Sequence, residues 1–186
     1  MVCGDNNLLV PARKVTLSFG GRTRHWYIYV PSSTSAGSSI VPLVVDLHGY
    51  GSCAEKLSKY SGWSRLAAEH GFVVAWPQGT EELSSSDPNP SWNAGQCCGE
   101  AIAGGGYVKA INDVGFLRAV VNETAATEPV DRLRVYFTGH SNGCSAQLRP
   151  TKGPPSQTDW LPCVRRYSEM AQRMAADASD MLAAIA

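Results

Sequence analysis

The 186-residue sequence lacks three features that would each place it in a common class of protein. No apolar run approaches the roughly 18 residues of a membrane-spanning helix, because the longest, 40–47, is interrupted by Pro42 and Asp46. Neither charge is in excess, with 16 Lys and Arg against 16 Asp and Glu. Residues 1–10 lack the basic and apolar segments of a signal peptide. We therefore expect no membrane partner and no nucleic-acid partner.

The sequence also lacks the spacings of common metal sites. Its six cysteines form no Cys-x-x-Cys pair, and its four histidines form no His-Glu-x-x-His motif. The adjacent Cys97 and Cys98 cannot easily bond to each other, so each is either a buried thiol or bridged elsewhere. We expect neither a metal site nor a cofactor.

Hydrophobic patterning in the first half of the chain predicts a hairpin followed by a buried strand. Residues 14–19 and 24–30 alternate polar and apolar side chains around Gly20 and Gly21, which is typical of a hairpin. The run 43–47 is short, mostly apolar and bounded by Pro42 and Gly49, as in a strand that is buried on both faces. It is therefore predicted to be a central parallel strand.

The rest of the pattern alternates helices with strands. Leu57, Tyr60, Trp63 and Ala67 recur at helical spacing, and a strand is predicted over 72–76. Residues 77–109 are rich in Gly, Ser, Pro and Asn and are expected to form a long surface loop.

A further helix and strand complete the pattern. The helix is expected to begin at Asn112 or Asp113, and Leu133, Val135 and Phe137 alternate along a strand that leads into Gly139. This β-α-β-α-β order predicts a parallel sheet with helices on both faces.

The predicted strand before Gly139 runs into Gly-His-Ser-Asn-Gly at 139–143, a G-x-S-x-G motif. The pentapeptide alone is a weak signal, but its place at the end of a strand matches a nucleophile elbow. In an elbow, the serine stands on a tight turn between a strand and a helix, and its neighbouring glycines relieve crowding. Ser141 is therefore the candidate nucleophile.

A second motif, His-Gly-Tyr-Gly at 48–51, follows the predicted strand 43–47. A turn of this kind presents a backbone N–H to the oxygen that becomes negative during acyl transfer, and the residue after the serine presents another. The expected oxyanion donors are thus the backbone N–H groups of Tyr50 and Asn142. His48 is expected to brace the loop rather than to transfer a proton.

With both motifs in place, the sequence resembles the polyhydroxybutyrate depolymerase-like esterases, which include feruloyl and acetyl xylan esterases of the α/β-hydrolase fold. The resembling segments are 45–51, 71–79, 91–99, 112–117 and 139–143. The resemblance implies a mostly parallel sheet with flanking helices and a serine carboxylic-ester hydrolase. Its substrate would be an ester of a polyester or of plant cell-wall polysaccharide, and its location extracellular. The resemblance also makes Asp113 a structural residue at a helix start rather than the catalytic acid.

The sequence departs from the family pattern after the elbow. Residues 14–145 match the pattern, whereas 146–169 hold four of the chain's 11 prolines and interrupt the helix expected after Ser141. The matching helical segment comes only within 170–186. We expect one partial domain with an irregular insert at 146–169, favouring a retained intron or a faulty gene model over a genuine surface insertion. The sheet is expected to be incomplete on its C-terminal side.

No histidine follows Ser141, although the triad order in this fold is serine, acid, histidine. A serine hydroxyl without a base is a weak nucleophile, so we expect the 186 residues to be inactive as an esterase. Two alternatives remain. One is a non-catalytic module that binds carbohydrate or polyester through aromatics such as Trp92 and Tyr107, and the other is no stable function, because an incomplete sheet exposes its edges.

Overall fold

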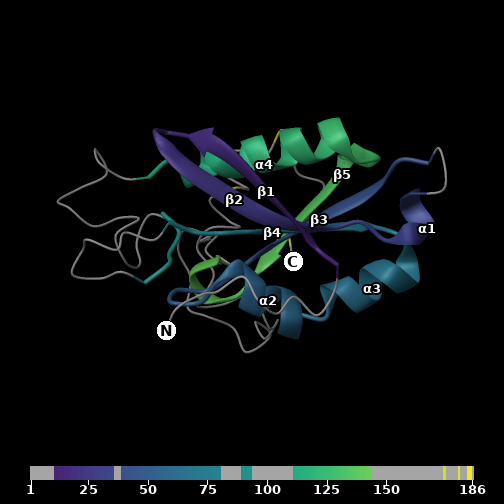
Figure 1. Ribbon diagram of the computed structural model, residues 1–186, viewed down its shortest axis with the longest axis horizontal. Helices are drawn as coiled ribbons and strands as arrows, with labels where there is room; N and C mark the ends of the chain where they lie inside the picture. Colours follow the sequence, from purple (N-terminus) through teal and green to yellow (C-terminus); the bar gives the residue numbers. More distant parts are fainter. Residues whose placement is uncertain are drawn as a thin grey trace, which may run out of the picture.

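The computed structural model describes residues 11–35, 39–80, 89–93 and 111–143, together with 174, 180 and 184–185. Its strands form one sheet in the order β1-β2-β4-β3-β5-β6 (Figure 1). The strands are β1 (Arg13–Phe19), β2 (Arg22–Tyr29), β3 (Val41–Leu47), β4 (Val73–Pro77), β5 (Val130–Gly139) and β6 (Ala184–Ile185). The α-helices are α1 (Ser32–Ser35), α2 (Ala54–Tyr60), α3 (Trp63–His70) and α4 (Asp113–Thr127), and a 3-10 turn, η2, spans Ser141–Gly143.

The first two strands form the predicted hairpin. Phe19 pairs with Arg22 across Gly20 and Gly21, whose φ angles of 58° and 74° suit glycine in a tight turn. Further into the sheet, β3 lies between β4 and β5 and is parallel to both. The prediction of a central parallel strand is confirmed.

Helices cover both faces of the sheet, as predicted. In Figure 1, α4 lies above the sheet, and α2 and α3 lie below it. Successive residues of β4 pack on opposite faces of the sheet: Val73 and Ala75 pack on the α4 side, whereas Val74 and Trp76 pack on the side of α2 and α3. All four side chains are fully buried, which explains the continuous apolar run in the sequence.

Where the apolar spacing predicted one helix through Leu57 and Ala67, the structure has two short ones. The helices α2 and α3 are separated at Ser61 and Gly62, and Gly62 has a φ of 76°. Glycine alone adopts this left-handed conformation without strain, so it turns the chain between two segments whose apolar residues keep a helical spacing.

Leu133 alternates with Val135 and Phe137 in the predicted strand, but it does not share their burial. Its side chain is 85% exposed, whereas Val135 and Phe137 are buried. The register explains the difference: Val130 pairs with Val41, but the next pair is Val135 with Leu43, so β5 has extra residues that bulge out of the sheet. Alternation in sequence continues through the bulge, but the facing direction of the side chains does not.

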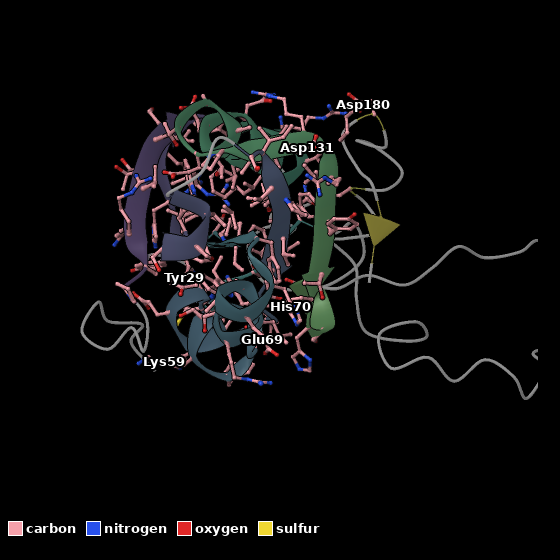
Figure 2. The ribbon with its side chains drawn as sticks, turned by 90° about the vertical axis from the view of Figure 1, so that its right-hand side faces the viewer. Tyr29, Lys59, Glu69, His70, Asp131 and Asp180 are labelled. Carbon is pink, nitrogen blue, oxygen red and sulfur yellow. The ribbon has the colours of Figure 1, made fainter. Side chains whose placement is uncertain are left out.

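The described residues near the end of the chain contact the sheet and α4. Met174 is fully buried in the core on the α4 side. Asp180, labelled in Figure 2, forms two hydrogen bonds with Arg118 of α4, at 2.6 and 3.0 Å. Ala184 and Ile185 pair in parallel with Tyr136 and Phe137 of β5. The segment after the predicted insert thus contributes to the same domain core.

Several sequence predictions fall outside the described residues. These are most of the loop at 77–109, the insert at 146–169, Tyr107, and all cysteines other than Cys53. None of the described helices has the length and apolar character needed to cross a membrane.

Candidate active site

The candidate nucleophile stands on a strained turn at the carboxyl end of β5. Ser141 has a φ of 53°, and it is the one non-glycine residue with positive φ among those described. The turn is crowded: a Cβ added to Gly143 would lie 2.3 Å from the Leu47 carbonyl oxygen, and one added to Gly139 would lie 2.6 Å from the same atom. Both glycines are therefore required, which is the geometry of a nucleophile elbow.

The His48–Gly51 turn lies directly beside the elbow. The His140 N–H donates to the Leu47 carbonyl at 3.0 Å, and a Cβ built on Gly49 would lie 3.2 Å from the Ser141 Cβ. Gly51 is held at φ 69°, and its N–H donates to the Pro90 carbonyl at 2.9 Å. The fold thus brings together the two motifs that the sequence placed 90 residues apart at Gly51 and Ser141. The assignment of Tyr50 and Asn142 as oxyanion donors stays a prediction.

His48 is fully buried, and both of its ring nitrogens have polar contacts. Its Nε2 accepts a hydrogen bond from the Gly79 N–H at 2.8 Å, and its Nδ1 lies 2.8 Å from the Gly49 carbonyl oxygen, so the proton sits on Nδ1. Burial lowers the pKa of His48 to about 4, because the protein interior disfavours the charged ring. A neutral ring engaged at both nitrogens joins the His48–Gly51 turn to Gly79 in the segment after β4.

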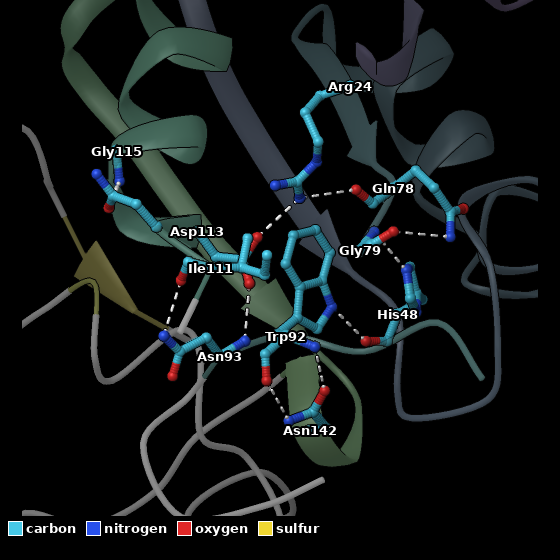
Figure 3. A network of polar contacts seen from close by, with 11 residues as sticks. Arg24, His48, Gln78, Gly79, Trp92, Asn93, Ile111, Asp113, Gly115 and Asn142 are labelled. Atoms are coloured by element: carbon cyan, nitrogen blue, oxygen red, sulfur yellow. Dashed lines mark hydrogen bonds and ion pairs between the residues drawn. The ribbon is translucent and has the colours of Figure 1, made fainter. Parts of the chain in front are cut away.

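Trp92 connects the elbow to this turn. Its backbone N–H donates to Asn142 Oδ1 at 2.7 Å, and Asn142 Nδ2 donates back to the Trp92 carbonyl at 3.1 Å. Its indole Nε1 donates to the His48 carbonyl at 2.8 Å, and the two rings pack at 5.1 Å between centroids. Figure 3 shows the Trp92 indole beside His48 and the Trp92 backbone beside Asn142 of the elbow. Trp92 is fully buried, so it is not the exposed aromatic platform that a binding module would need.

A buried ion pair anchors the same network to α4. The Arg24 guanidinium donates to Asp113 Oδ1 at 2.7 Å, while the other oxygen of Asp113 accepts from the Asn93 N–H at 2.7 Å (Figure 3). The N-cap of α4 is Asn112, whose side chain accepts from the Gly115 N–H. Asp113 therefore stands at the helix start, one of the two positions predicted. The sequence did not indicate Arg24 and Asn93 as partners of Asp113, since Arg24 occupies an ordinary polar position in the predicted hairpin.

A pocket of about 200 Å³ opens beyond the carboxyl end of β4. Its lining comes from β2 and the segment after β4: Arg22, Thr23, Arg24, His25, Gln78, Gly79 and Thr80. Ligands of open α/β sheets bind outside the carboxyl ends of the strands, and the pocket shares that edge with Ser141. Gly79 lines this pocket, and its backbone N–H donates to His48.

No histidine contacts the Ser141 hydroxyl through a hydrogen bond in the described part of the chain. His140 is exposed next to it in sequence, and His48 uses both nitrogens elsewhere. Within the same residues there is no cluster of three His, Cys, Asp or Glu able to hold a metal ion. Cys53 is buried and disulfide-bonded.

A layered sheet with a serine on a left-handed turn after a central strand defines the α/β-hydrolase class. No family model matches the sequence. The chain is 32% identical over 150 residues to NocK, a candidate esterase of Nocardia uniformis subsp. tsuyamanensis, covering 81% of this chain and 38% of that protein. It is 34% identical over 117 residues to poly(3-hydroxyalkanoate) depolymerase C of Paucimonas lemoignei, covering 62% of this chain and 24% of the depolymerase.

The fold is shared with solved esterases. A ferulic acid esterase superposes with a TM-score of 0.55 over 94% of this chain and 58% of its own, at 16% identity. The resemblance predicted from the motifs is confirmed: the sequence relatives are an esterase-like protein and a polyester depolymerase, and the fold is that of the α/β-hydrolases. The chain spans less than two-fifths of the length of these two sequence relatives.

Proposed function

We propose that Ser141 is the nucleophile of a carboxylic-ester hydrolase site. The observation that carries the proposal is its φ of 53° at the crowded turn after β5, a strain that a non-glycine residue tolerates only where its surroundings enforce it. The hydroxyl would attack the ester carbonyl, and the backbone N–H groups of Tyr50 and Asn142 would stabilise the oxygen that becomes negative. The substrate would be a polyester or an acyl ester of plant cell-wall polysaccharide, as the names of the depolymerase and of a further relative, a bifunctional acetylxylan esterase/xylanase of Neocallimastix patriciarum, favour.

We propose further that these 186 residues do not turn esters over unaided. A general base must lie within hydrogen-bonding reach of the hydroxyl, and no histidine follows Ser141 in the sequence. His48 is neutral and engaged at both nitrogens, so its role in this proposal is to brace the loop. The described residues would then supply the nucleophile and the oxyanion donors of a catalytic site but not its general base.

An added base tests both statements on the chain as it stands. We would measure hydrolysis of p-nitrophenyl butyrate with and without imidazole in solution, comparing the parent chain with Ser141→Ala. Imidazole should produce turnover in the parent above the Ser141→Ala level, and without imidazole the two should coincide. A matched control is Ser33→Ala on α1, an exposed serine that should behave as the parent.

The outcomes separate the two statements. Equal rates for parent and Ser141→Ala in imidazole would overturn the nucleophile assignment. A difference between them without imidazole would instead show that some group of this chain already serves as the base.

An extracellular location is part of the proposal. The disulfide bond of Cys53 supports it, because structural disulfides persist in oxidising compartments.

A further inference from the structure

Trp92 is held on both sides along the chain. Just before it, Ser91 exchanges two backbone hydrogen bonds with Thr80, at 2.9 and 3.0 Å. Just after it, the Asn93 N–H donates to Asp113, and the Asn93 side chain donates to the Ile111 carbonyl at 2.7 Å. The backbone of Trp92 is therefore fixed to the end of β4 and to the start of α4, two rigid parts of the domain.

From this fixed position, Trp92 uses different groups to hydrogen-bond to the two segments that hold the candidate oxyanion donors, the elbow and the His48–Gly51 turn. Its backbone N–H and carbonyl contact the Asn142 side chain in the elbow, and its indole N–H contacts the His48 carbonyl in the neighbouring turn. All three residues are at most 3% exposed. Buried hydrogen bonds of this kind are costly to lose, because the groups left behind find no water.

We propose that Trp92 is a positioning residue that sets the separation between the elbow and the His48–Gly51 turn. The proposal rests on the function proposed above, since the separation matters because it aims the Tyr50 and Asn142 N–H groups at one oxygen. Trp92 has no contact with the reacting atoms in this scheme. It acts through the two backbone segments that it joins, and misplacement of a donor by about 1 Å is enough to lower a rate strongly.

The chain offers a matched control for this role. Trp26 is also a buried tryptophan of the core on the α4 side, at 1% exposure against 0% for Trp92. Its indole nitrogen has no hydrogen-bond partner among the residues that the structure describes, whereas that of Trp92 donates to the His48 carbonyl. Trp92→Phe and Trp26→Phe therefore make the same change in side chain, but only Trp92→Phe removes a hydrogen bond.

The first readout needs no catalytic activity. Amide hydrogen exchange would be followed at residues 48–51 and 140–143, with α4 as an internal reference. In Trp92→Phe, which keeps the backbone contacts with Asn142, exchange should become about fivefold to tenfold faster at 48–51 while α4 stays as in the parent, the change expected from loss of one buried hydrogen bond. Trp26→Phe should leave both segments unchanged. Equal exchange in the two variants would overturn the proposal and leave Trp92 as a packing residue.

If Trp92→Phe does not fold, Asn142→Ala decides the question. This variant removes the side chain that hydrogen-bonds to the Trp92 backbone and leaves the indole contact with His48 in place. Faster exchange at 48–51 as well as at 140–143 would support coupling through Trp92, and a change confined to 140–143 would refute it.

The second readout is kinetic and uses imidazole-supported turnover of p-nitrophenyl butyrate. Trp92→Phe should lower kcat about tenfold with KM nearly unchanged, since it alters donors that act in the transition state. Trp26→Phe should change neither. If Ser141→Ala has no effect on this reaction, the proposed function fails, but the exchange result still stands on its own. If turnover depends on Ser141 and the two Phe variants have equal kcat, the positioning role fails and the proposed function survives.

Discussion

The guanidinium of Arg24 lies 2.7 Å from the carboxylate of Asp113, although the two residues are 89 positions apart in the sequence. Their side chains are 4% and 0% exposed. Arg24 also lies 3.9 Å above the Phe116 ring and donates to the Gln78 carbonyl. One buried cation thus joins the hairpin, the end of β4 and the start of α4, and through Asp113 it reaches the backbone next to Trp92.

Removing Arg24 should be severely destabilising. Arg24→Met would leave the Asp113 carboxylate buried without its cation, and breaking such a pair costs about 3–5 kcal/mol. Arg134→Met is the matched control, because the Arg134–Asp131 pair has side chains 44% and 17% exposed and should lose less than about 1 kcal/mol. Urea unfolding of the three proteins measures both values. Similar losses in the two variants would contradict an anchoring role for the Arg24 pair.

The backbone strain at Ser141 predicts a substitution that raises stability, in contrast to the loss expected for Arg24→Met. Glycine adopts a φ of 53° freely, whereas the same conformation costs a residue with a Cβ about 1–2 kcal/mol. The greater freedom of glycine in the unfolded chain offsets part of this difference in stability. Ser141→Gly should therefore be about 1 kcal/mol more stable than Ser141→Ala, and neither should support Ser141-dependent hydrolysis. At Ser52, where φ is not positive, the order of the Gly and Ala variants should be reversed. A Gly variant less stable than the Ala variant at position 141 would argue against an enforced strain.

The sequence allowed the hairpin, the central strand β3 and the tight turn at 139–143 to be predicted, because each depends on local chemistry. Gly20 and Gly21 set a turn, and apolar runs mark buried strands. The break at Gly62 and the outward position of Leu133 were missed, since the apolar spacing continues through both irregularities.

The partners in the site could not be predicted for a different reason. The contacts of Arg24 with Asp113, and of Trp92 with Asn142, join residues 89 and 50 positions apart. A hydrogen bond between such residues is decided by how the elements pack, and no local pattern records it. Only the strand-end motifs indicated which segments would meet, because carboxyl ends of parallel strands share one edge of the sheet.

The predicted insert can be tested by its removal. Met174 is fully buried beside α4, and β6 pairs with β5, so the segment after residue 169 contributes to the core. Joining residue 145 directly to residue 170 should therefore preserve the fold and keep or raise Tm. Met174→Ala should instead cost about 2–5 kcal/mol, because it leaves a cavity. A deletion variant that melts several degrees lower than the parent would identify 146–169 as an integral part of the domain.

Asp46 should make stability fall as the pH rises. Its carboxyl group is 3% exposed on β3 and accepts a hydrogen bond from Trp76 Nε1 at 3.2 Å. Burial raises its pKa from 3.8 to about 7, so between these values the folded state binds more protons than the unfolded state. The free energy of unfolding therefore decreases with rising pH across this window, by as much as about 4 kcal/mol at 1.36 kcal/mol per pH unit.

Asp46→Asn isolates this effect, because asparagine does not titrate and all other groups are shared with the parent. The difference in unfolding free energy, Asp46→Asn minus parent, should be constant below pH 4, grow in favour of the variant through pH 7, and then level off. Asp131→Asn provides the contrast: hydrogen bonds from the Leu133 N–H and the Arg134 side chain hold the pKa of Asp131 below its usual value. Ionised Asp131 is stabilising, and this contribution is gained as the pH rises to about 4, so the Asp131→Asn difference should stay nearly constant from about pH 5 upward while the Asp46→Asn difference changes. Urea unfolding at pH 4, 5.5, 7 and 8 would distinguish the two, and a flat difference for Asp46→Asn would mean that Asp46 ionises as readily in the folded chain as in water.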